Sequence, residues 1–274
     1  MEVAFMMKKN VLTLVLVGII AGALPRCIEA QHCGCATHQC CSRWGYCGTS
    51  KDYCGTGCQE GPGYTLPPIN HVSLPFLTQK LFNGIIHQAD ASCPGKKFYT
   101  RAAFLDAHNS FYEFGRIGSV DDSKREIAAF FGHVTHAIGH FCYIEEIDGP
   151  SKKYCDEVYT KSYPCNANKR YYGRGPLQLT WNFNYGAAGK SIGFDGLNSP
   201  ETVTNDPVIS FKTALWYWMK FVHPVIGEGF GKTIRAINNL ECDGRNPARV
   251  KKRVAYYIEY CKQLNVSPGN NLTC

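Results

Sequence analysis

The chain has 274 residues, a formal net charge of +7 at pH 7, 19% charged residues and fifteen cysteines. This length fits one full-size domain together with one small module. The basic residues are spread along the chain, with no run beyond Lys251-Lys252-Arg253. We therefore expect no nucleic-acid partner.

Residues 1–30 have the composition of a secretory signal peptide. Lys8 and Lys9 supply a positive start, residues 11–24 are apolar and uncharged, and small or polar residues follow up to Ala30. This order is typical of a signal peptide that is cleaved after Ala30. A membrane anchor is the alternative, but the apolar stretch is short for a span of about 20 residues. We predict a secreted protein that does not associate with membranes. Loss of three basic and two acidic residues with this segment lowers the net charge from +7 to +6.

The cysteines predict a disulfide framework. Fourteen of the fifteen follow residue 30, and seven of these lie within residues 33–58. Dense cysteine after an export signal indicates an oxidising compartment and disulfide bonds. A metal site is the weaker alternative, because the cysteines do not form two Cys-x-x-Cys pairs.

Residues 31–62 form a separate small module. They contain almost no aliphatic side chains, so their cysteines must replace a hydrophobic core. Residues 63–72 follow as a linker, with Gly61-Pro62-Gly63 at its start and Pro67-Pro68 inside it. The remaining residues, 73–274, have the composition of a globular domain.

Helical patterns dominate residues 73–274. Apolar residues recur at helical spacing over residues 98–112, 126–140, 211–221 and 247–263. The Asp121-Asp122-Ser123 sequence before the second of these is an N-terminal helix signal. No regularly spaced strands occur. We predict a mainly α-helical domain with long loops.

The small module contains an adjacent cysteine pair followed by Ser-x-aromatic-Gly-aromatic-Cys. The segment reads Cys40-Cys41-Ser42-Arg43-Trp44-Gly45-Tyr46-Cys47. With this motif, nearly all of residues 31–60 resemble the hevein-type chitin-binding module. The resemblance implies that chitin and N-acetylglucosamine oligosaccharides are the ligands.

The aromatic residues of the module support this interpretation independently. Trp44, Tyr46 and Tyr53 lie in a unit too small to bury them, and exposed rings of this kind need a partner. Sugar rings offer apolar faces that stack on aromatic rings, and a hydroxyl such as that of Ser42 can hold an N-acetyl carbonyl. The alternative is that a ring packs against the disulfides.

The resemblance also implies the pairing of the module's cysteines, as Cys33–Cys41, Cys35–Cys47 and Cys40–Cys54. The eighth cysteine of the family would stand near Gly63, so Cys58 has no obvious partner. It is expected to be a free thiol or an intermolecular link.

Two stretches of the large domain carry a second resemblance. Residues 126–149 read EIAAFFGHVTHAIGHFCYIEEIDG and residues 171–186 read YYGRGPLQLTWNFNYG. With residues 193–197 and the C-terminal GNNLTC, they make the chain from about residue 76 onward similar to plant class IV chitinases of glycoside hydrolase family 19. The resemblance implies a lysozyme-like α-helical domain and cleavage of internal β-1,4 bonds with inversion.

An inverting glycosidase needs one carboxyl as general acid and another as general base. The resemblance assigns the base to Glu146, the second acid of Cys-Tyr-Ile-Glu-Glu, and the positioning of the attacking water to Thr180. It assigns sugar contacts in the cleft to His136, Gln178, Asn184 and Asn238, and support of the acid to Glu241 and Arg253. Local hydrogen bonding is the alternative role of the polar residues.

The general acid is missing. The family motif is His-Glu-Thr-Gly-His, and this chain has His136-Ala137-Ile138-Gly139-His140. Alanine cannot donate a proton, and Ile138 places an apolar branch where the family has a hydroxyl. Loss of general acid catalysis typically costs about 10²–10⁴-fold in rate.

Two neighbouring groups are possible replacements for the acid. Glu145 is adjacent to the base, but its side chain should point elsewhere; His136 is one residue from the lost acid. We expect neither to restore useful activity, because catalytic groups must be placed within fractions of an ångström.

His133, His136 and His140 share one helix face, which raises the possibility of a metal site. We expect hydrogen bonding there instead, with no metal and no cofactor.

The resemblance implies three further disulfides, Cys93–Cys142, Cys155–Cys165 and Cys242–Cys274. Cys261 remains over and is expected to be a buried small apolar residue. Sequons at Asn265 and Asn271 allow glycosylation, and Pro268 makes the first the poorer acceptor.

We therefore predict a secreted, monomeric, chitinase-like protein that binds chitin and hydrolyses it little or not at all. Its roles would lie in plant defence or in recognition of chitin fragments. The main alternative is an active inverting endochitinase, and residue 137 discriminates the two. A purely structural or storage protein is a third possibility, which would show no retention on chitin.

Overall fold

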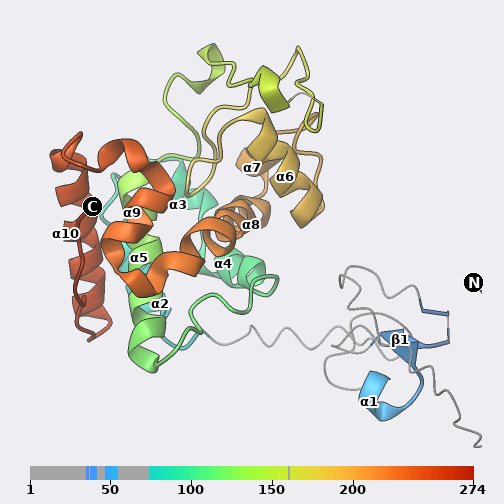
Figure 1. The fold of residues 1–274 in the computed structure, drawn as a ribbon, viewed down its shortest axis with the longest axis horizontal. Helices are drawn as coiled ribbons and strands as arrows, with labels where there is room; N and C mark the ends of the chain where they lie inside the picture. The colour runs from blue at the N-terminus through green and yellow to red at the C-terminus, as the bar shows by residue number, and fades with distance from the viewer. Residues whose placement is uncertain (1–34, 37, 42–46, 55–73, 160) are drawn as a thin grey trace, which may run out of the picture. The chain divides into compact units, whose positions relative to one another are not determined.

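The structure is a computed structural model that describes residues 35, 36, 38–41, 47–54, 74–159 and 161–274. The chain divides into two compact units, residues 1–69 and residues 70–274, and each unit is described by itself (Figure 1). The predicted signal peptide and linker, together with Cys33, Ser42, Trp44, Tyr46 and Cys58, lie outside the described residues.

The described part of the small unit is held by two disulfides. Strands β1 (Cys40–Cys41) and β2 (Cys47–Gly48) pair antiparallel, and helix α1 (Lys51–Cys54) follows. The disulfides join Cys35 to Cys47 and Cys40 to Cys54, which are two of the pairs that the hevein resemblance implies. Tyr53 is half-buried because its ring lies over Gly48, where a Cβ atom would come within 2.5 Å of that ring. This tyrosine therefore has a packing role inside the module.

The large unit is built from helices joined by long loops. Its α-helices are α2 (Gln79–Ile86), α3 (Gly95–Phe98), α4 (Arg101–His108), α5 (Val120–Ile138), α6 (Asn182–Ile192), α7 (Thr202–Asn205), α8 (Pro207–Tyr217), α9 (Phe230–Asn238) and α10 (Pro247–Gln263). Short 3-10 and π-helical turns are η1 (Gly149–Ser151), η2 (Glu157–Tyr159), η3 (Trp218–Val222), η4 (His223–Glu228) and η5 (Asn239–Glu241). The mainly α-helical fold class is confirmed.

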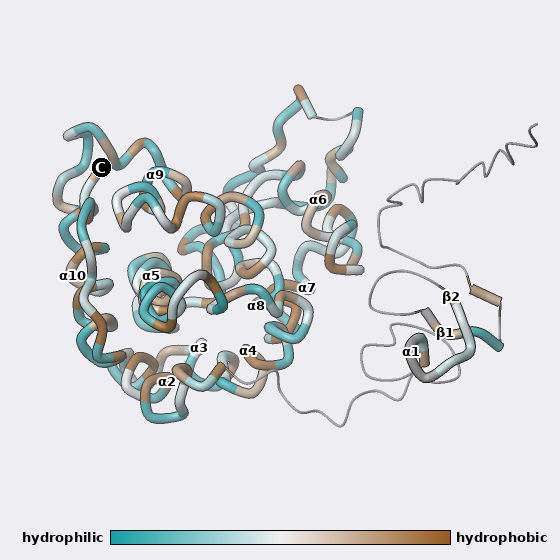
Figure 2. The backbone as a smooth tube through the Cα atoms, turned by 60° about the horizontal axis from the view of Figure 1, so that its bottom comes forward, coloured by the Kyte–Doolittle hydropathy of each residue, from teal (hydrophilic) through white to brown (hydrophobic). Residues whose placement is uncertain are grey.

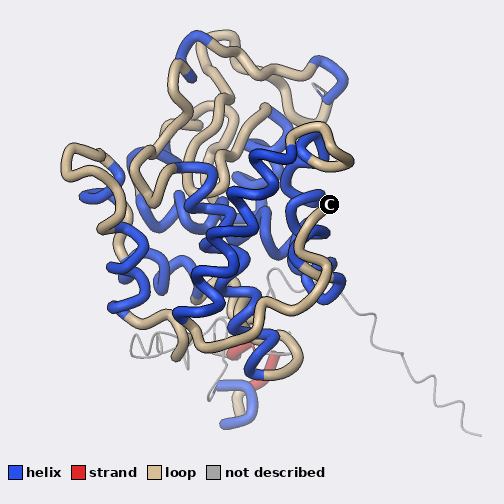
Figure 3. Tube along the Cα trace, turned by 90° about the vertical axis from the view of Figure 1, so that its left-hand side faces the viewer, coloured by secondary structure: helices blue, strands red, loops and turns tan. Residues whose placement is uncertain are grey.

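Helix α5 is the centre of the large unit. It packs along α10 and also contacts α9, while α4 packs along α8. Figure 2 shows α5 end-on, with α2, α8, α9 and α10 around it. The long loops gather at one end of the unit (Figure 3).

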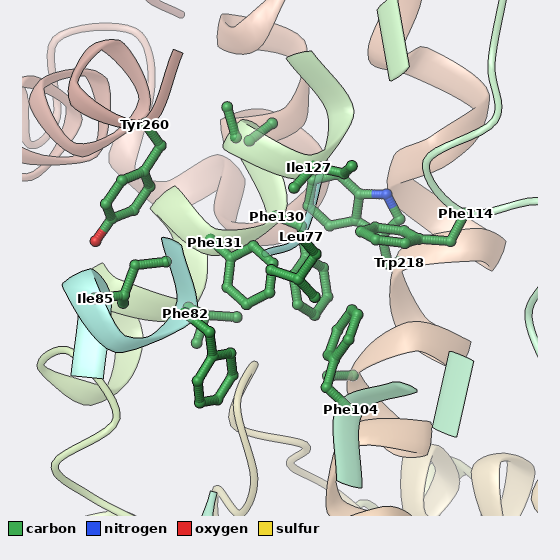
Figure 4. Close-up of a cluster of buried hydrophobic side chains, with 14 of the residues drawn as sticks. Leu77, Phe82, Ile85, Phe104, Phe114, Ile127, Phe130, Phe131, Trp218 and Tyr260 are labelled. Carbon is green, nitrogen blue, oxygen red and sulfur yellow. The ribbon is translucent and has the colours of Figure 1, made fainter. Parts of the chain in front are cut away.

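Aromatic side chains fill the core around α5. Phe130 lies 5.1 Å from Phe114 and 5.3 Å from Trp218 between ring centroids, both edge to face (Figure 4). Phe82, Phe104 and Phe131 continue the cluster, and all these rings are almost fully buried. Because such rings bury large areas and prefer this geometry, they fix how the helices cross.

Among the described residues, no helix is long and apolar enough to cross a membrane.

The ends of α5 are set by two residues that the sequence prediction did not use. Ser119 is the N-cap and forms a capping box with Asp122, so the helix begins at Val120 and not near Glu126. Gly139 ends the helix in the left-handed conformation, with φ 57°. The predicted helix over residues 126–140 is therefore longer at its start and shorter at its end.

The prediction of one helix over residues 98–112 is wrong. Tyr99 is extended, with ψ 118°, and its side chain is buried in the core. Thr100 then caps α4 by accepting a hydrogen bond from the Ala103 amide at 3.1 Å. The prediction over residues 247–263 is confirmed at both ends, with Asn246 as the N-cap of α10. The prediction of a helix over residues 211–221 is confirmed, but its bounds differ: the α-helix spans Pro207–Tyr217 and continues as the π-helical turn η3.

Three disulfides fasten loops of the large unit. They are Cys93–Cys142, Cys155–Cys165 and Cys242–Cys274, the pairs that the chitinase resemblance implies. Cys261 is a buried free thiol on α10.

His223 makes a pH-dependent contribution to stability through its contact with a buried carboxylate. The Glu126 side chain is fully buried and accepts hydrogen bonds from the Gly115 amide (2.8 Å), Trp218 Nε1 (2.9 Å) and His223 Nδ1 (2.6 Å). The hydrogen bond with Glu126 raises the pKa of His223 above its ordinary value, although partial burial opposes this.

We expect the His223→Gln variant to lose about 1 kcal/mol of unfolding free energy at pH 5 relative to the native chain. A histidine whose pKa is raised by folding stabilises the protein below its unfolded pKa, and the contribution disappears as pH rises through the folded value. The difference between the two proteins should therefore shrink between pH 6 and pH 9. Urea unfolding across this range measures it, and a difference that stayed constant with pH would contradict the assignment.

Candidate functional site

Glu146 lies on the loop that follows α5. Its backbone amide donates to Gly173 O at 2.7 Å, and the Gly173 amide donates back to Glu146 Oε2 at 3.0 Å. The other carboxylate oxygen accepts from Lys152 Nζ at 2.5 Å and from the Tyr154 hydroxyl at 3.0 Å. The carboxylate is thus held by three donors from two different loops.

The hydrogen bonds keep Glu146 ionised. Burial alone would raise the pKa of the carboxyl, but the donors Lys152, Gly173 and Tyr154 outweigh it, so the pKa lies below its usual value. The side chain is 22% exposed, which leaves it open to solvent. An ionised, partly exposed carboxylate can accept a proton from water.

A pocket of about 480 Å³ has Tyr154, whose hydroxyl contacts this carboxylate, in its wall, although Glu146 itself does not line the pocket. It brings together four residues that the chitinase resemblance singles out, namely Gln178, Thr180, Asn184 and Asn238. The Thr180 hydroxyl donates to Gln178 O at 2.8 Å, which leaves its oxygen able to accept from a ligand or water. The side-chain amide groups of Asn184 and Asn238 donate to Thr180 O (2.9 Å) and Glu241 Oε1 (3.1 Å), and Asn238 Oδ1 accepts from the Leu240 amide at 3.2 Å. The polar wall of this pocket suits a neutral, hydroxyl-rich ligand.

A second pocket of about 520 Å³ lies between the first half of α5 and the C-terminal tail. It contains none of the predicted catalytic or sugar-contacting residues, so the smaller pocket is the candidate site.

Ala137 stands in the last turn of α5 and is exposed to solvent. The next residue, Ile138, is fully buried in the hydrophobic core. The apolar branch that Ile138 supplies in place of the family's hydroxyl therefore packs inward, and of these two residues only Ala137 lies at the surface. The methyl group of Ala137 offers neither a proton nor a hydrogen-bond donor.

Glu241 and Arg253 form a buried ion pair beneath this helix end. Arg253 Nε lies 2.7 Å from Glu241 Oε2 and Nη2 lies 3.0 Å from Oε1. Arg253 Nη1 also donates to His133 Nδ1 at 3.0 Å. The two partners satisfy each other, so the pair persists with alanine at position 137.

His133 is neutral in this network. Its Nε2 lies 2.8 Å from the Thr233 hydroxyl, which itself donates to Phe230 O. The Nε2 atom therefore carries the proton, and Nδ1 accepts from Arg253. Burial, followed by the charge of Arg253, lowers the pKa of His133 well below its ordinary value.

Neither His136 nor Glu145 is suited to donate the proton that the missing acid would supply. Burial and then the Arg253 charge lower the pKa of His136 to about 4, so near neutral pH its ring is the neutral imidazole, which is a very weak acid. Glu145 accepts from the Tyr172 hydroxyl at 2.9 Å and lies 3.9 Å from Arg174 Nε, on a different set of partners from Glu146. These contacts agree with the expectation that its side chain points away.

The three histidines at the end of α5 do not converge. His133 contacts Arg253 and Thr233, whereas His140 meets the Tyr256 ring edge to face at 5.2 Å. In the parts of the chain that the structure describes, no three His, Cys, Asp or Glu side chains gather closely enough to hold a metal ion.

Lys152 and Tyr154 were missed by the sequence analysis. Both follow η1, where the chain turns back toward Glu146, and no motif in Ser-Lys-Lys-Tyr-Cys signals that return. The contacts of Lys152 and Tyr154 with the predicted base Glu146 could therefore be recognised only in the folded chain.

Comparisons with known proteins give consistent matches. The family model described as "Chitinase class I" matches residues 76–226, and the model described as "Chitin recognition protein" matches residues 26–62. "Endochitinase EP3" of Arabidopsis thaliana is 63% identical over 265 residues, which cover 96% of this chain and 97% of that relative. "Chitinase 5" of Oryza sativa subsp. japonica is 55% identical and covers 90% and 91%. The crystal structure of a family GH19, class IV chitinase from Zea mays aligns with a TM-score of 0.70 and 57% identity, over 73% of this chain and 98% of that one.

Proposed function

Because the chain belongs to the family 19 chitinases and carries a chitin recognition module, we propose that it binds chitin with absent or much reduced hydrolysis. The observation that carries this proposal is Ala137, exposed at the position where the family has its proton donor. Both carboxyl groups are needed for an inverting glycosidase, and one of them is missing here.

Of the two carboxyl groups that the mechanism requires, only the proposed general base remains. Glu146 is the proposed general base, and Thr180, in the wall of the pocket that also contains Tyr154, is proposed to hold the attacking water. Without an acid on the leaving oxygen, the departing sugar must leave as an alkoxide, which typically slows the reaction by about 10²–10⁴-fold. The low pKa of His136 and the separate contacts of Glu145 support the view that no neighbour supplies the proton.

The proposed architecture assigns binding to two places. A signal peptide (1–30) directs secretion, the module (31–62) holds the polymer, and a linker (63–72) precedes the domain (73–274) that holds single chains in its pocket. The ligands are chitin and N-acetylglucosamine oligosaccharides, and the protein would serve plant defence or the recognition of chitin fragments outside the cell.

An active inverting endochitinase is the second candidate. The intact hydrogen bonding of Glu146 and the polar pocket lined by Tyr154 favour this possibility. Incubation of the native chain with chitohexaose, with Glu146→Gln as the matched control, discriminates the two. We expect both proteins to release products at the same background rate. Rapid release by the native chain alone would overturn the proposal.

We expect Trp44→Ala to weaken retention on chitin at least about tenfold, since loss of a large stacking ring removes a dominant contact. Trp44→Phe keeps an aromatic face and should keep most of the retention. A chitin pull-down at several protein concentrations measures both. Unchanged retention of Trp44→Ala would place the main binding site in the large domain.

A further inference from the structure

Three cationic side chains lie on one face of α10. Arg249 is three residues before Lys252 and four before Arg253, so the three side chains share a face of the helix. Arg253 is buried and donates to His133 of α5 at 3.0 Å, so this face of α10 meets α5. Arg249 and Lys252 are exposed, and their charges therefore lie at the surface beside α5.

The part of α5 that meets this face includes Ala137. Ala137 is one turn after His133, so the two residues share a face of α5. Just past the helix, the His140 ring meets the Tyr256 ring at 5.2 Å, and Tyr256 is one turn after Lys252 on α10. Ala137 thus stands between two contacts with α10, where its exposed methyl group leaves space and adds no charge.

The cations outnumber the carboxylates at this place. Glu241 accepts from Arg253 Nε at 2.7 Å and lies 3.7 Å from Arg249 Nη1, so one carboxylate faces two guanidinium groups and the nearby Lys252. Burial lowers the pKa of His136, in the last turn of α5, and the charges of the three cations lower it further, whereas the Glu241 charge raises it. The surface around the end of α5 is therefore positively charged.

The next carboxylate along the chain is already occupied. Asp243 is held by Arg235 at 2.5 Å and by Arg245 at 3.0 Å. It is thus paired with two cations of its own and does not neutralise the group on α10. A surface with unbalanced positive charge attracts anions from solution.

The positive surface adjoins the polar pocket. Asn238 lines the pocket, and its side-chain amide group donates to Glu241 Oε1 at 3.1 Å. The same carboxylate oxygen lies 3.7 Å from Arg249 Nη1. A sugar chain that enters or leaves the pocket on this side can therefore bring a charged substituent close to Arg249.

We propose that Arg249, Lys252 and the open surface at Ala137 form a binding site for the carboxylate of an acidic oligosaccharide, a chain that contains uronic acid units. The guanidinium of Arg249 can donate two parallel hydrogen bonds to a carboxylate, and Lys252 adds a point charge. The ligand is anionic because the cations outnumber their partners. It is a sugar because the site adjoins the pocket, and in this respect the inference rests on the proposed function of that pocket. Chitin is neutral, so this ligand is a further one.

The test is a calorimetric titration of the full chain with trigalacturonate and, separately, with chitotriose, at low salt. Arg249→Gln together with Lys252→Gln should weaken trigalacturonate binding about tenfold and leave chitotriose binding within about twofold, since only the charged contacts are lost. Lys251→Gln together with Lys262→Gln is the matched control. It removes the same charge from exposed positions of α10 that lie off this face, and should keep both affinities within about twofold.

Substitutions at residue 137 test the site without removing a cation. Ala137→Glu places a carboxylate of the chain itself beside Arg249 and should weaken trigalacturonate binding about tenfold. Ala137→Gln has nearly the same shape without the charge and should keep the affinity within about twofold. Both positions are exposed, and thermal melts of all variants check that the fold is retained.

The ligand controls separate an acidic sugar from other ligands. Fully methyl-esterified trigalacturonate has the same sugar backbone without charge, and equal binding of the acid and the ester would overturn recognition of the carboxylate. Acetate that bound as tightly as trigalacturonate would show a site for any small anion and overturn the assignment to a sugar. Equal weakening by the two α10 double variants would show that only the overall charge matters, which also overturns the site.

The two ligands keep this proposal distinct from the proposed function. A native chain that binds chitotriose but not trigalacturonate overturns the acidic site alone. A native chain that binds trigalacturonate but not chitotriose overturns chitin binding and leaves the acidic site in place.

Discussion

Ala137→Glu should raise the rate of chitohexaose hydrolysis by about 10²–10⁴-fold over the native chain, which is the usual contribution of general acid catalysis. Ala137 is exposed in the last turn of α5, so a longer side chain can be added there without crowding the core. The proposed base Glu146 is already ionised and hydrogen-bonded. The buried pair of Glu241 and Arg253 is also in place beneath this helix end. The substitution therefore supplies the one group that the reaction lacks.

Matched variants show whether the gain in hydrolysis rate comes from proton donation by the new carboxyl group. Ala137→Gln has nearly the same shape and cannot donate as an acid, so it should stay inactive. Adding Glu146→Gln to Ala137→Glu should remove the gain, because both carboxyl groups are required. Rates are followed by separation of the released oligosaccharides. A properly folded Ala137→Glu protein that stays inactive would mean that the rest of the site has also lost its geometry.

Ile138 needs no substitution in this experiment. Its side chain is fully buried in the core, so Ile138→Thr would bring a hydroxyl into an apolar environment and leave the cleft unchanged. The single substitution at residue 137 is thus the sharper test than a double exchange to the family motif.

Arg253→Met should lower the unfolding free energy by about 3–5 kcal/mol, because it leaves the Glu241 carboxylate buried without its main partner. Glu241 and Arg253 are both almost fully buried, and together with His133 they connect η5 and α10 to α5. For a domain of this size, each kcal/mol corresponds to about 2–4 °C in melting temperature. Thermal melts and urea unfolding at neutral pH measure the loss.

Arg249→Met is the control for this prediction. Arg249 Nη1 lies 3.7 Å from the same carboxylate, but its side chain is 59% exposed, so its contribution should stay below about 1 kcal/mol. Adding Glu241→Gln to Arg253→Met should restore part of the stability, since an uncharged amide is less costly to bury. Equal effects of the two arginine substitutions would show that burial of the pair does not matter.

Local patterns predicted the helices well where local signals were sufficient. Helix α10 has a proline at its first position and Asn246 as a side-chain cap, and its predicted bounds agree with the structure. The prediction over residues 98–112 was wrong because Tyr99 leaves the helical conformation to bury its ring in the core. Periodicity cannot indicate this, since it reports which residues are apolar and not which helix they meet.

The residues of the candidate site were likewise predictable only in part. Gln178, Thr180, Asn184 and Asn238 were named from motifs, and the fold places all four on one pocket. Lys152 and Tyr154 were not named, although they contact the proposed base directly. Their role depends on how the loop after η1 returns toward Glu146, which no short motif encodes.

The sequence by itself determined the family, the order of module and domain, and the alanine at the proposed position of the general acid. These are properties of which residue stands at which position, so they survive without any coordinates. Only the tertiary structure decided that Ile138 faces the core, that His136 is held neutral, and that the cationic face of α10 meets α5. Each of these depends on burial or on contacts between segments distant in the chain, and both arise only when the helices and loops pack together.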